Sequence, residues 1–310
     1  MRKKIAIIGG GQIGQILAML ATHKEMGNIV ILDVPDYEKP VKGKAMDLMH
    51  MAPHGNYDVD IRGTSDYKDI AGADIVIVTA GVPRKEGMTR EDLLSTNIRI
   101  IREIAEGVKE NAPDAFCIIL TNPLDAMVYA FHKLTGFPKN QVVGMAGTLD
   151  TARYRSLLAK ELGVSVADIS GVVLGGHGPT MVPLPRLTTV GGVPLTEIAS
   201  QELIERVVKR TRDAGTEIVQ LFGKGSAFFS PAWSAMIIAE SYLKDKGRVL
   251  PCTALCEGEY GINGLFIGVP CLITAKGVEK IFEIELTDEE RALMENAKTA
   301  VQKTVDECNL

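Results

Sequence analysis

A run of glycines near the start of the chain has the spacing of a phosphate-binding loop. Glycines 9, 11 and 14 form the pattern G-x-G-x-x-G. The first allows a tight turn, the second lets a pyrophosphate approach the main chain, and the third lets a helix pack on a strand. The phosphates then meet the free N–H groups at the start of that helix. The residues predicted to bind a dinucleotide here are Gly9, Gly10, Gly11, Gln12, Ile13 and Gly14.

A downstream carboxylate indicates which dinucleotide would bind. Asp33 follows the apolar run 29–32 and lies 19 residues after Gly14. It can accept hydrogen bonds from a ribose diol and would repel a 2′-phosphate, so we expect NAD rather than NADP. The glycine pattern alone is weak, because glycine loops join strands to helices in many proteins. Its place between the apolar run 5–8 and a helical segment, with the acid after the next run, makes it a strong signal.

Two polar segments follow later apolar runs, where strands are expected to end. The loop 81–90 contains Arg84 and Arg90; it can be a lid over a ligand or a solvated surface loop. Asn122, in Thr-Asn-Pro after the run 116–120, offers both a donor and an acceptor. The alternative for Asn122 is a turn before the proline.

Three residues of the second half form another candidate group. His177 lies between glycines at 175–178, which leave its imidazole accessible to a ligand. A lone histidine is more often structural, and the glycine frame favours function only modestly. Asp150 and Arg153 are three residues apart and so share one helix face. The plainer alternative for this pair is a helix N-cap with a surface ion pair.

Composition and charge exclude several classes of protein. Hydrophobic residues make up 46% and charged residues 24% of the 310 residues, which is typical of a soluble globular protein. A net charge of −5 argues against nucleic acid as a partner. The basic residues at 2–4 precede an apolar run of only four residues, so we expect neither a signal peptide nor a membrane anchor.

The cysteines indicate a reducing compartment. None of the five forms a CxxC pair, and their number is odd. We therefore expect reduced thiols in a cytoplasmic setting, with no structural zinc or other metal. The cysteines are Cys117, Cys252, Cys256, Cys271 and Cys308.

The order of apolar runs predicts an α/β fold. Strand-like runs at 5–8, 29–32, 58–61, 74–81, 116–120 and 141–145 alternate with helical segments. This alternation predicts an N-terminal Rossmann domain, 1–147, with a doubly wound parallel sheet whose strand ends carry the ligand site. The remainder, 148–310, reads as an α+β substrate domain, with a hairpin near 187–195 and helices at 196–222, 226–245 and 287–308. The site should then lie between the two domains.

Taken together, these motifs resemble the lactate/malate dehydrogenase family over nearly the whole chain. The matching stretches follow the glycine loop and Asp33 in order: TAGVPRKEGMTR, TNP, GTLDTARYR, GGHGPTMVPLPR and GSAFFSPA at 225–232. Several ordered motifs are far more specific than any one of them. Within the family, the chain is most similar to the bacterial, lactate-dehydrogenase-like malate dehydrogenases.

The resemblance implies a role for each candidate residue. His177 would be the acid–base group that takes the hydroxyl proton as hydride leaves C2, and Asp150 would fix its tautomer and stabilise the imidazolium. Arg153 would hold the C1 carboxylate, Arg90 would polarise the C2 oxygen, and Asn122 would hold substrate and nicotinamide in register. The further cofactor contacts implied are Asn97, Leu120, Thr121 and Asn122.

Arg84 decides the expected substrate. Family members that act on malate carry arginine at the matching place, whereas those that act on lactate usually carry glutamine. Arg84 could pair the second carboxylate of oxaloacetate, and pyruvate would leave it unpaired. The resemblance thus implies reversible hydride transfer between L-malate and NAD. The alternatives are a dehydrogenase of lactate or another 2-hydroxy acid, and a non-catalytic NAD-binding protein.

Two departures from the family pattern concern loops. Pro179 stands where the family usually has aspartate, which questions the loop geometry near His177, and Glu86 stands where proline is frequent. Neither replaces a residue with an implied role. The resemblance also implies a homodimer or homotetramer, with a small dicarboxylate substrate and no membrane partner.

Overall fold

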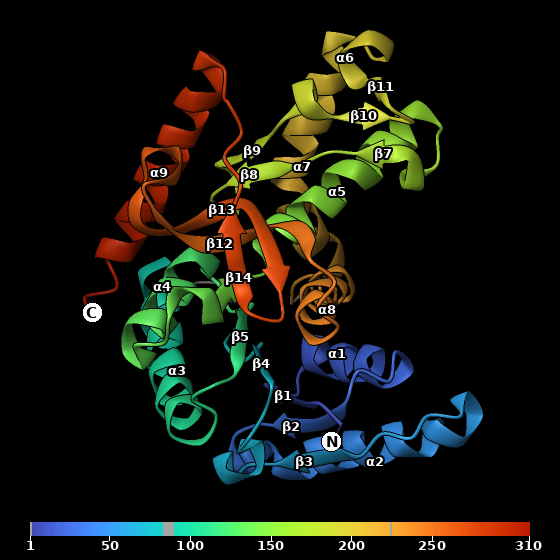
Figure 1. Cartoon of the computed structure of the whole chain (residues 1–310), viewed down its shortest axis with the longest axis vertical. Coiled ribbons are helices and arrows are strands. Elements are labelled where there is room, and N and C mark those ends of the chain that lie inside the picture. The colour runs from blue at the N-terminus through green and yellow to red at the C-terminus, as the bar shows by residue number, and fades with distance from the viewer. Residues whose placement is uncertain (1, 83–89, 224) are drawn as a thin grey trace.

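A single mixed sheet runs through the molecule. The computed structural model describes residues 2–82, 90–223 and 225–310, with only the main chain of Arg90. Its eleven-stranded sheet has the order β3-β2-β1-β4-β5-β6-β12-β13-β8-β9, and β14 pairs with β13. A three-stranded sheet, β11-β10-β7, lies apart from it. Figure 1 shows the N-terminal elements gathered at one end of the molecule and β7, β10, β11 and α6 at the other.

The first six strands of the large sheet are parallel, as the alternation of runs predicts. They pair in register, for example Ile5 with Ile29 on one side and with Ile75 on the other. Apolar side chains fill both faces because helices cover both faces. The strands are β1 (Lys4–Ile8), β2 (Asn28–Leu32), β3 (Ile61–Thr64), β4 (Ile75–Val78), β5 (Phe116–Ile119) and β6 (Val142–Gly144).

The third strand begins later than expected. The run 58–61 predicts a strand there, but the ladder of β3 starts at Ile61. Before it, the main-chain N–H of Asp60 donates to the side chain of Asn28 instead of to a strand. Gly63 then lets the helix α2 approach, since a Cβ there would lie 2.5 Å from the main chain of Val41.

Helices lie on both faces of the parallel strands, which makes the sheet doubly wound. Helices α3 and α4 pack together on one face, and α1 packs with α8 and α2 on the other (Figure 1). The helices of this half are α1 (Gln12–His23), α2 (Glu38–Gly55), α3 (Arg90–Asn111) and α4 (Leu124–Thr135).

The second half extends the same sheet with antiparallel strands. The pair Thr253–Gly144 joins β12 to β6, and the pair Gly268–Gly175 joins β13 to β8. The expected hairpin is present, with Thr189 opposite Pro194. The strands are β7 (Ile169–Ser170), β8 (Val173–Gly175), β9 (Met181–Pro183), β10 (Thr189–Val190), β11 (Val193–Pro194), β12 (Arg248–Glu257), β13 (Asn263–Thr274) and β14 (Gly277–Ile281).

The long helices of this half match the expected segments, with one break. The segment 196–222 divides at Ser200, whose side chain accepts the N–H of Leu203 and caps a new helix. Thr287 and Glu290 form a reciprocal capping box at the start of α9. The helices are α5 (Ala146–Leu162), α6 (Leu195–Ile198), α7 (Gln201–Phe222), α8 (Phe229–Leu243) and α9 (Asp288–Asp306). Short 3₁₀ turns lie at Pro35–Tyr37, Tyr67–Ile70, Lys139–Gln141, Val166–Asp168, Pro185–Leu187 and Glu259–Gly261.

Candidate active site

His177 lies in the loop between β8 and β9, just past the end of β8. Gly175 and Gly178 beside it have φ values of +85° and +132°, which residues with a side chain rarely adopt. The glycines therefore set the course of the loop. The His177 side chain keeps 15% of its surface exposed, so a small ligand can reach the imidazole.

Asp150 lies within α5, with its carboxylate between His177 and Arg153. Its Oδ2 accepts a hydrogen bond from Nδ1 of His177 at 2.9 Å, and its Oδ1 accepts from Nη1 of Arg153 at 3.3 Å. The Asp150 side chain is 3% exposed and that of Arg153 12% exposed, so this is a buried pair and not a surface one. With Nδ1 engaged, Nε2 is the ring nitrogen left to exchange a proton.

Arg153 retains hydrogen-bond donors for a ligand. Its Nε is buried and has no partner among the residues that the structure describes. Burial lowers the pKa of Arg153, and the charge and hydrogen bond of Asp150 act in the opposite direction. A buried guanidinium with an unpaired donor suits the carboxylate of a small acid.

The electrostatics of this cluster favour a protonated His177. Burial alone would lower the pKa of His177, but the charge and hydrogen bond of Asp150 and the charge of Asp125 outweigh it. The pKa of His177 is therefore raised above its ordinary value, although Arg153 acts against the shift. An imidazole of this kind can hold a proton at neutral pH and release it on demand.

Asp125, in the first turn of α4, is a member of the cluster that sequence reasoning missed. Its Oδ2 accepts the main-chain N–H of His177 at 2.8 Å, and its Oδ1 accepts from Oγ1 of Thr253 at 3.1 Å. Burial raises the pKa of its carboxyl to about 6, and the hydrogen bonds oppose that rise. The available signal was an acid within the otherwise apolar stretch 124–131.

The carboxyl end of β5 carries Asn122 and its neighbours. The Asn122 side chain is exposed, whereas Thr121 is buried and donates from Oγ1 to the carbonyl of Ala80 at 2.6 Å. Asn97 is fully buried, and its Nδ2 donates to the carbonyl of Asn122 at 2.6 Å while its Oδ1 accepts the N–H of Val82 at 2.9 Å. The described bonds of Asn97 thus hold the chain segments after β4 and β5 together.

The glycine loop has the shape that a pyrophosphate needs. Gly9 has φ +101°, and a Cβ on Gly14 would lie 1.9 Å from the carbonyl of Gly9. A Cβ on Gly11 would meet nothing within 4 Å, so this side of the loop is open. The helix α1 behind it has no side-chain cap, which leaves N–H groups for an anion.

Asp33 lies beside this loop and shapes it. Its Oδ2 accepts the N–H of Gly10 at 2.7 Å and its Oδ1 accepts the N–H of Val34 at 2.8 Å. Each carboxylate oxygen has a second lone pair for a ribose hydroxyl. The residues present therefore fit a dinucleotide.

The predicted residues of the loop 81–90 lie outside this description. Arg84 and Glu86 fall in the undescribed segment 83–89, and only the main chain of Arg90 is described, at the start of α3. The loop around Pro179, in contrast, is described and leaves the pairing of His177 with Asp150 intact.

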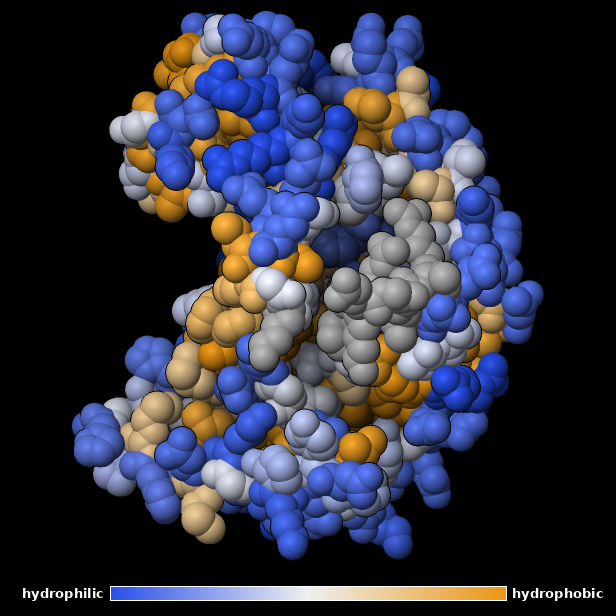
Figure 2. Space-filling model, turned by 180° about the vertical axis from the view of Figure 1, so that it is seen from behind, coloured by the Kyte–Doolittle hydropathy of each residue, from blue (hydrophilic) through white to orange (hydrophobic). Residues whose placement is uncertain are grey.

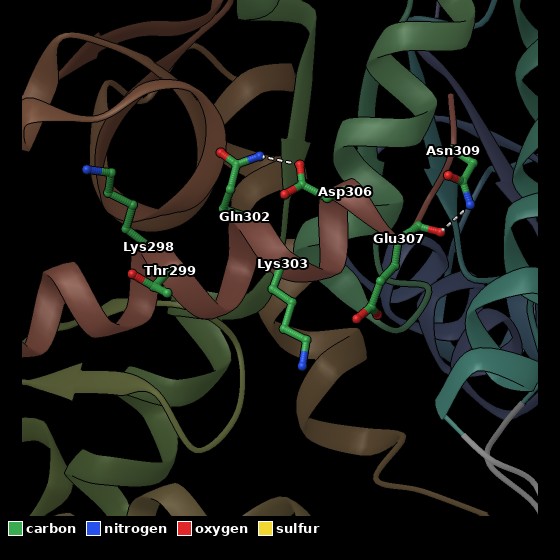
Figure 3. A pocket seen from close by; sticks show the side chains of 7 residues that line it. All are labelled: Lys298, Thr299, Gln302, Lys303, Asp306, Glu307 and Asn309. Atoms are coloured by element: carbon green, nitrogen blue, oxygen red, sulfur yellow. Dashed lines mark hydrogen bonds between the residues drawn. The ribbon is translucent and has the colours of Figure 1, made fainter.

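The surface of the molecule is hollowed in several places. Figure 2 shows a recess between the upper and lower parts of the molecule. A separate open hollow of about 680 Å³ follows α9 and is lined only by residues from 298 to 309, none of which belongs to the cluster around His177 (Figure 3). We therefore place the candidate site at the cluster of Asp150, Arg153 and His177.

The described residues contain no group of three or more His, Cys, Asp and Glu side chains arranged to hold a metal ion. In the same part of the chain, no helix is long and apolar enough to cross a membrane. The five cysteines are buried and unpaired.

Comparison with known proteins covers the whole chain. The profile of the lactate/malate dehydrogenase NAD binding domain matches residues 3–144, and that of the lactate/malate dehydrogenase alpha/beta C-terminal domain matches residues 147–309. A malate dehydrogenase of Myxococcus xanthus is 53% identical over 309 residues, covering 100% of this chain and 98% of that protein. Malate dehydrogenase 1 of Anaeromyxobacter dehalogenans is 55% identical over 311 residues, covering 100% and 99%.

Solved structures of two kinds of enzyme share the fold. A malate dehydrogenase of Cryptosporidium parvum superimposes with a TM-score of 0.97 at 42% identity, covering 100% of this chain and 99% of that one. A lactate dehydrogenase of the same organism, complexed with lactic acid and nicotinamide adenine dinucleotide, gives 0.96 at 41% identity, covering 100% and 98%. The fold alone therefore does not discriminate between the two substrates.

Proposed function

The chain belongs to the lactate/malate dehydrogenase family, and we propose that it is an NAD-dependent L-malate dehydrogenase. It interconverts (S)-malate and NAD⁺ with oxaloacetate and NADH. The observation that carries the chemistry is the buried pair of His177 and Asp150, 2.9 Å apart, next to a guanidinium with an unpaired donor. The observation that favours malate is the 53% and 55% identity to malate dehydrogenases along the full chain.

The mechanism assigns one step to each residue of the cluster. Nε2 of His177 takes the proton of the C2 hydroxyl, and the carboxylate of Asp150 holds the ring in the tautomer with a proton on Nδ1 and then stabilises the imidazolium. Arg153 binds the C1 carboxylate through its unpaired donors. A bound NAD⁺ would supply the acceptor for the hydride that leaves C2. In the reverse direction the protonated His177 returns the proton to the C2 oxygen of oxaloacetate.

We propose that the cofactor lies along the carboxyl ends of the parallel strands. Contacts with the phosphates come from Gly9, Gly10, Gly11, Gln12, Ile13 and Gly14, and the ribose is held by Asp33. Leu120, Thr121 and Asn122 contribute contacts near the nicotinamide, with Asn122 also facing the substrate. Asn97 supports this region by holding the carbonyl of Asn122, and a direct contact of Asn97 with the cofactor stays a prediction. Residues 1–147 would form the cofactor domain and 148–310 the substrate domain.

Substrate choice rests on two arginines whose side chains lie outside the description. We propose that Arg84 pairs the C4 carboxylate of oxaloacetate and that Arg90 polarises the C2 oxygen. The test is initial-rate oxidation of NADH with oxaloacetate and with pyruvate, in the unsubstituted enzyme and in Arg84→Gln. We expect strong preference for oxaloacetate, and a shift toward pyruvate in the variant. Preference of the unsubstituted enzyme for pyruvate would move the function to lactate. Unchanged selectivity in the variant would reject the role of Arg84.

An exposed apolar face supports assembly into a homodimer or homotetramer. Large apolar side chains are exposed on α1, α2 and α8 and at the end of α7, and α1 packs against both α2 and α8. Figure 2 shows hydrophobic surface along the left edge of the molecule. Among the exposed apolar side chains of these four helices are Met19, Met46, Met49, Leu221, Phe222, Phe229 and Trp233. Analytical ultracentrifugation distinguishes monomer, dimer and tetramer, and a monomer at micromolar concentration would reject the proposal.

We also propose a cytoplasmic location. Five buried, unpaired cysteines suit a reducing compartment. Fractionation of the native cells, with activity measured in each fraction, tests it; recovery of the activity outside the cytoplasm would reject the assignment.

A further inference from the structure

Asp125 places a second carboxylate against His177, on a different part of that residue from Asp150. Asp150 accepts from the ring nitrogen Nδ1, whereas Asp125 accepts from the main-chain N–H of the same residue at 2.8 Å. The two acids come from different helices, α5 and α4. His177 is thus held both by its ring and by its backbone.

The second carboxylate oxygen of Asp125 is also hydrogen-bonded, and this bond holds the Asp125 side chain in place. Oγ1 of Thr253, on β12, donates to Oδ1 of Asp125 at 3.1 Å. Thr253 in turn pairs with Gly144 of β6, where the two halves of the sheet join. The carboxylate therefore connects α4, β12 and the loop that carries His177; Asp125 and Thr253 are buried, and the bond from His177 is part-buried.

The position of Asp125 in the chain relates it to the substrate site. It lies three residues after Asn122, whose side chain is exposed at the end of β5. A reaction at C2 needs the imidazole and the substrate-holding amide at a fixed separation, since a misplacement of about 1 Å can cost a hundredfold in rate. Asp125 joins the segment of Asn122 to the loop of His177 and so sets that separation.

The charge of Asp125 acts on the imidazole as well. The cluster has no net charge when His177 is protonated, because two positive side chains then balance the carboxylates of Asp125 and Asp150. When His177 is neutral, Arg153 alone is positive and one negative charge is in excess. A nearby negative charge favours the protonated form of an imidazole. The first turn of a helix also favours a negative charge at the position of Asp125.

We propose that Asp125 is a positioning residue for His177 in the dehydrogenase reaction, which fixes its backbone and helps to hold its proton. The inference rests on the proposed function, because it takes His177 as the acid–base group. It adds a charge and a mechanical link that the pair of His177 and Asp150 does not contain.

The test compares three variants by their pH profiles. Asp125→Asn keeps an oxygen to accept the N–H of His177 but removes the charge. Thr253→Val keeps the acid but removes the hydrogen bond that favours its ionised form. Thr135→Val is the matched control, because it deletes a buried hydroxyl on α4 that donates to its own helix, accepts the N–H of Phe137 just beyond that helix and bonds to neither acid. Each is assayed for kcat/KM of oxaloacetate reduction from pH 6 to 9.

Reduction needs a protonated His177, so the rate falls as pH rises through its pKa. We call this fall in kcat/KM the limb of the pH profile. We expect Asp125→Asn to move the limb to lower pH by about half a unit to one unit. Thr253→Val should move it in the same direction by a smaller amount. Thr135→Val should leave it in place. The titration of the His177 imidazole by NMR, identified by the signal missing in His177→Asn, should shift in the same order without any substrate.

Several results would overturn the inference. A uniform loss of rate in Asp125→Asn with an unmoved limb would show a merely structural role, and a limb moved to higher pH would show the opposite charge effect. If Asp125→Asn does not fold, an unmoved limb in Thr253→Val would decide against the inference. Absence of oxaloacetate turnover in the unsubstituted enzyme would instead reject the proposed function. The NMR titration would still show whether Asp125 raises the pKa of His177.

Discussion

Removal of the charge of Asp150 tests the central element of the mechanism. In Asp150→Asn the amide oxygen can still accept the hydrogen bond from Nδ1 of His177, so the geometry at 2.9 Å is kept and the charge is lost. The Asp150 side chain is 3% exposed, and water therefore screens this charge little. The substitution isolates the electrostatic support of the imidazolium.

The expected size of the effect follows from the burial of the pair. An opposite charge at this distance shifts a pKa by about 1–3 units. Asp150→Asn keeps a hydrogen bond to the ring and removes only the charge, so we take the lower part of that range, about 1–2 units or about 1.4–3 kcal/mol. At a pH above the limb, oxaloacetate reduction should fall by about 10-fold to 100-fold, because fewer molecules hold the proton.

The assay is kcat/KM for oxaloacetate across the pH range, with Asp168→Asn as the matched control. Asp168 is exposed and lies in a short turn after α5, so the same chemical change there should leave the profile unaltered. A limb that stays in place in Asp150→Asn would refute the reasoning, even if the rate fell at every pH. Circular dichroism of both variants checks that the fold is kept.

Three further outcomes follow from the geometry. Gly11→Ala should preserve the fold and weaken NADH binding at least tenfold, because the new Cβ enters the open side of the loop. NADH binding is measured by fluorescence titration. Gly43→Ala is the control, since a Cβ there also has no neighbours within 4 Å. Asn97→Ala should lower the free energy of unfolding by about 2–4 kcal/mol in urea, since it removes a fully buried side chain and leaves part-buried main-chain groups without their partners. The raised pKa of Asp125 means that the folded state binds this proton more tightly than the unfolded state. Stability relative to Asp125→Asn should therefore decline as pH rises from about 4 to 6, by about 3 kcal/mol, and a constant difference in urea unfolding would contradict this.

Local patterns in the sequence were enough to predict the cofactor half. All of the apolar runs except 58–61 contain a strand that is buried on both faces, and the glycines 9, 11 and 14 have the steric roles that their spacing predicts. Such features depend on residues that are close together in the sequence or on a regular alternation of strands and helices. The fold class and the family were therefore predictable, and both are confirmed.

The strands β12, β13 and β14 were not predicted, and the prolines of β12 and β13 explain part of the difficulty. Proline inside an apolar run argues against a strand because it removes a donor. In the structure, the register places Pro251 directly opposite Pro270, so both missing donors fall at the same level of one ladder. That compensation depends on pairing between distant residues and has no local signature.

Asp125 was missed for a similar reason. Its partners lie 52 and 128 residues away in the chain, and only the folded sheet brings them together. Asp150 and His177, in contrast, were singled out by a helical spacing and a glycine frame, and the resemblance to the family supplied their expected roles. A residue that acts through the main chain of a distant residue is harder to predict from sequence than one whose neighbours in the sequence form a recognisable motif.

The proposed site lies where the sheet changes from parallel to antiparallel strands. A single residue pair joins β6 to β12 and a single pair joins β8 to β13, and Gly144 and Gly268 allow these close approaches. Thr253 belongs to the first junction, and the loop of His177 begins at the second. The bond from Thr253 to Asp125 and the bond from His177 to Asp125 therefore tie both junctions to one carboxylate. The position of His177, the proposed acid–base residue, is thus set by the same contacts that join the two halves of the sheet, so we expect damage to either junction to appear first in catalysis.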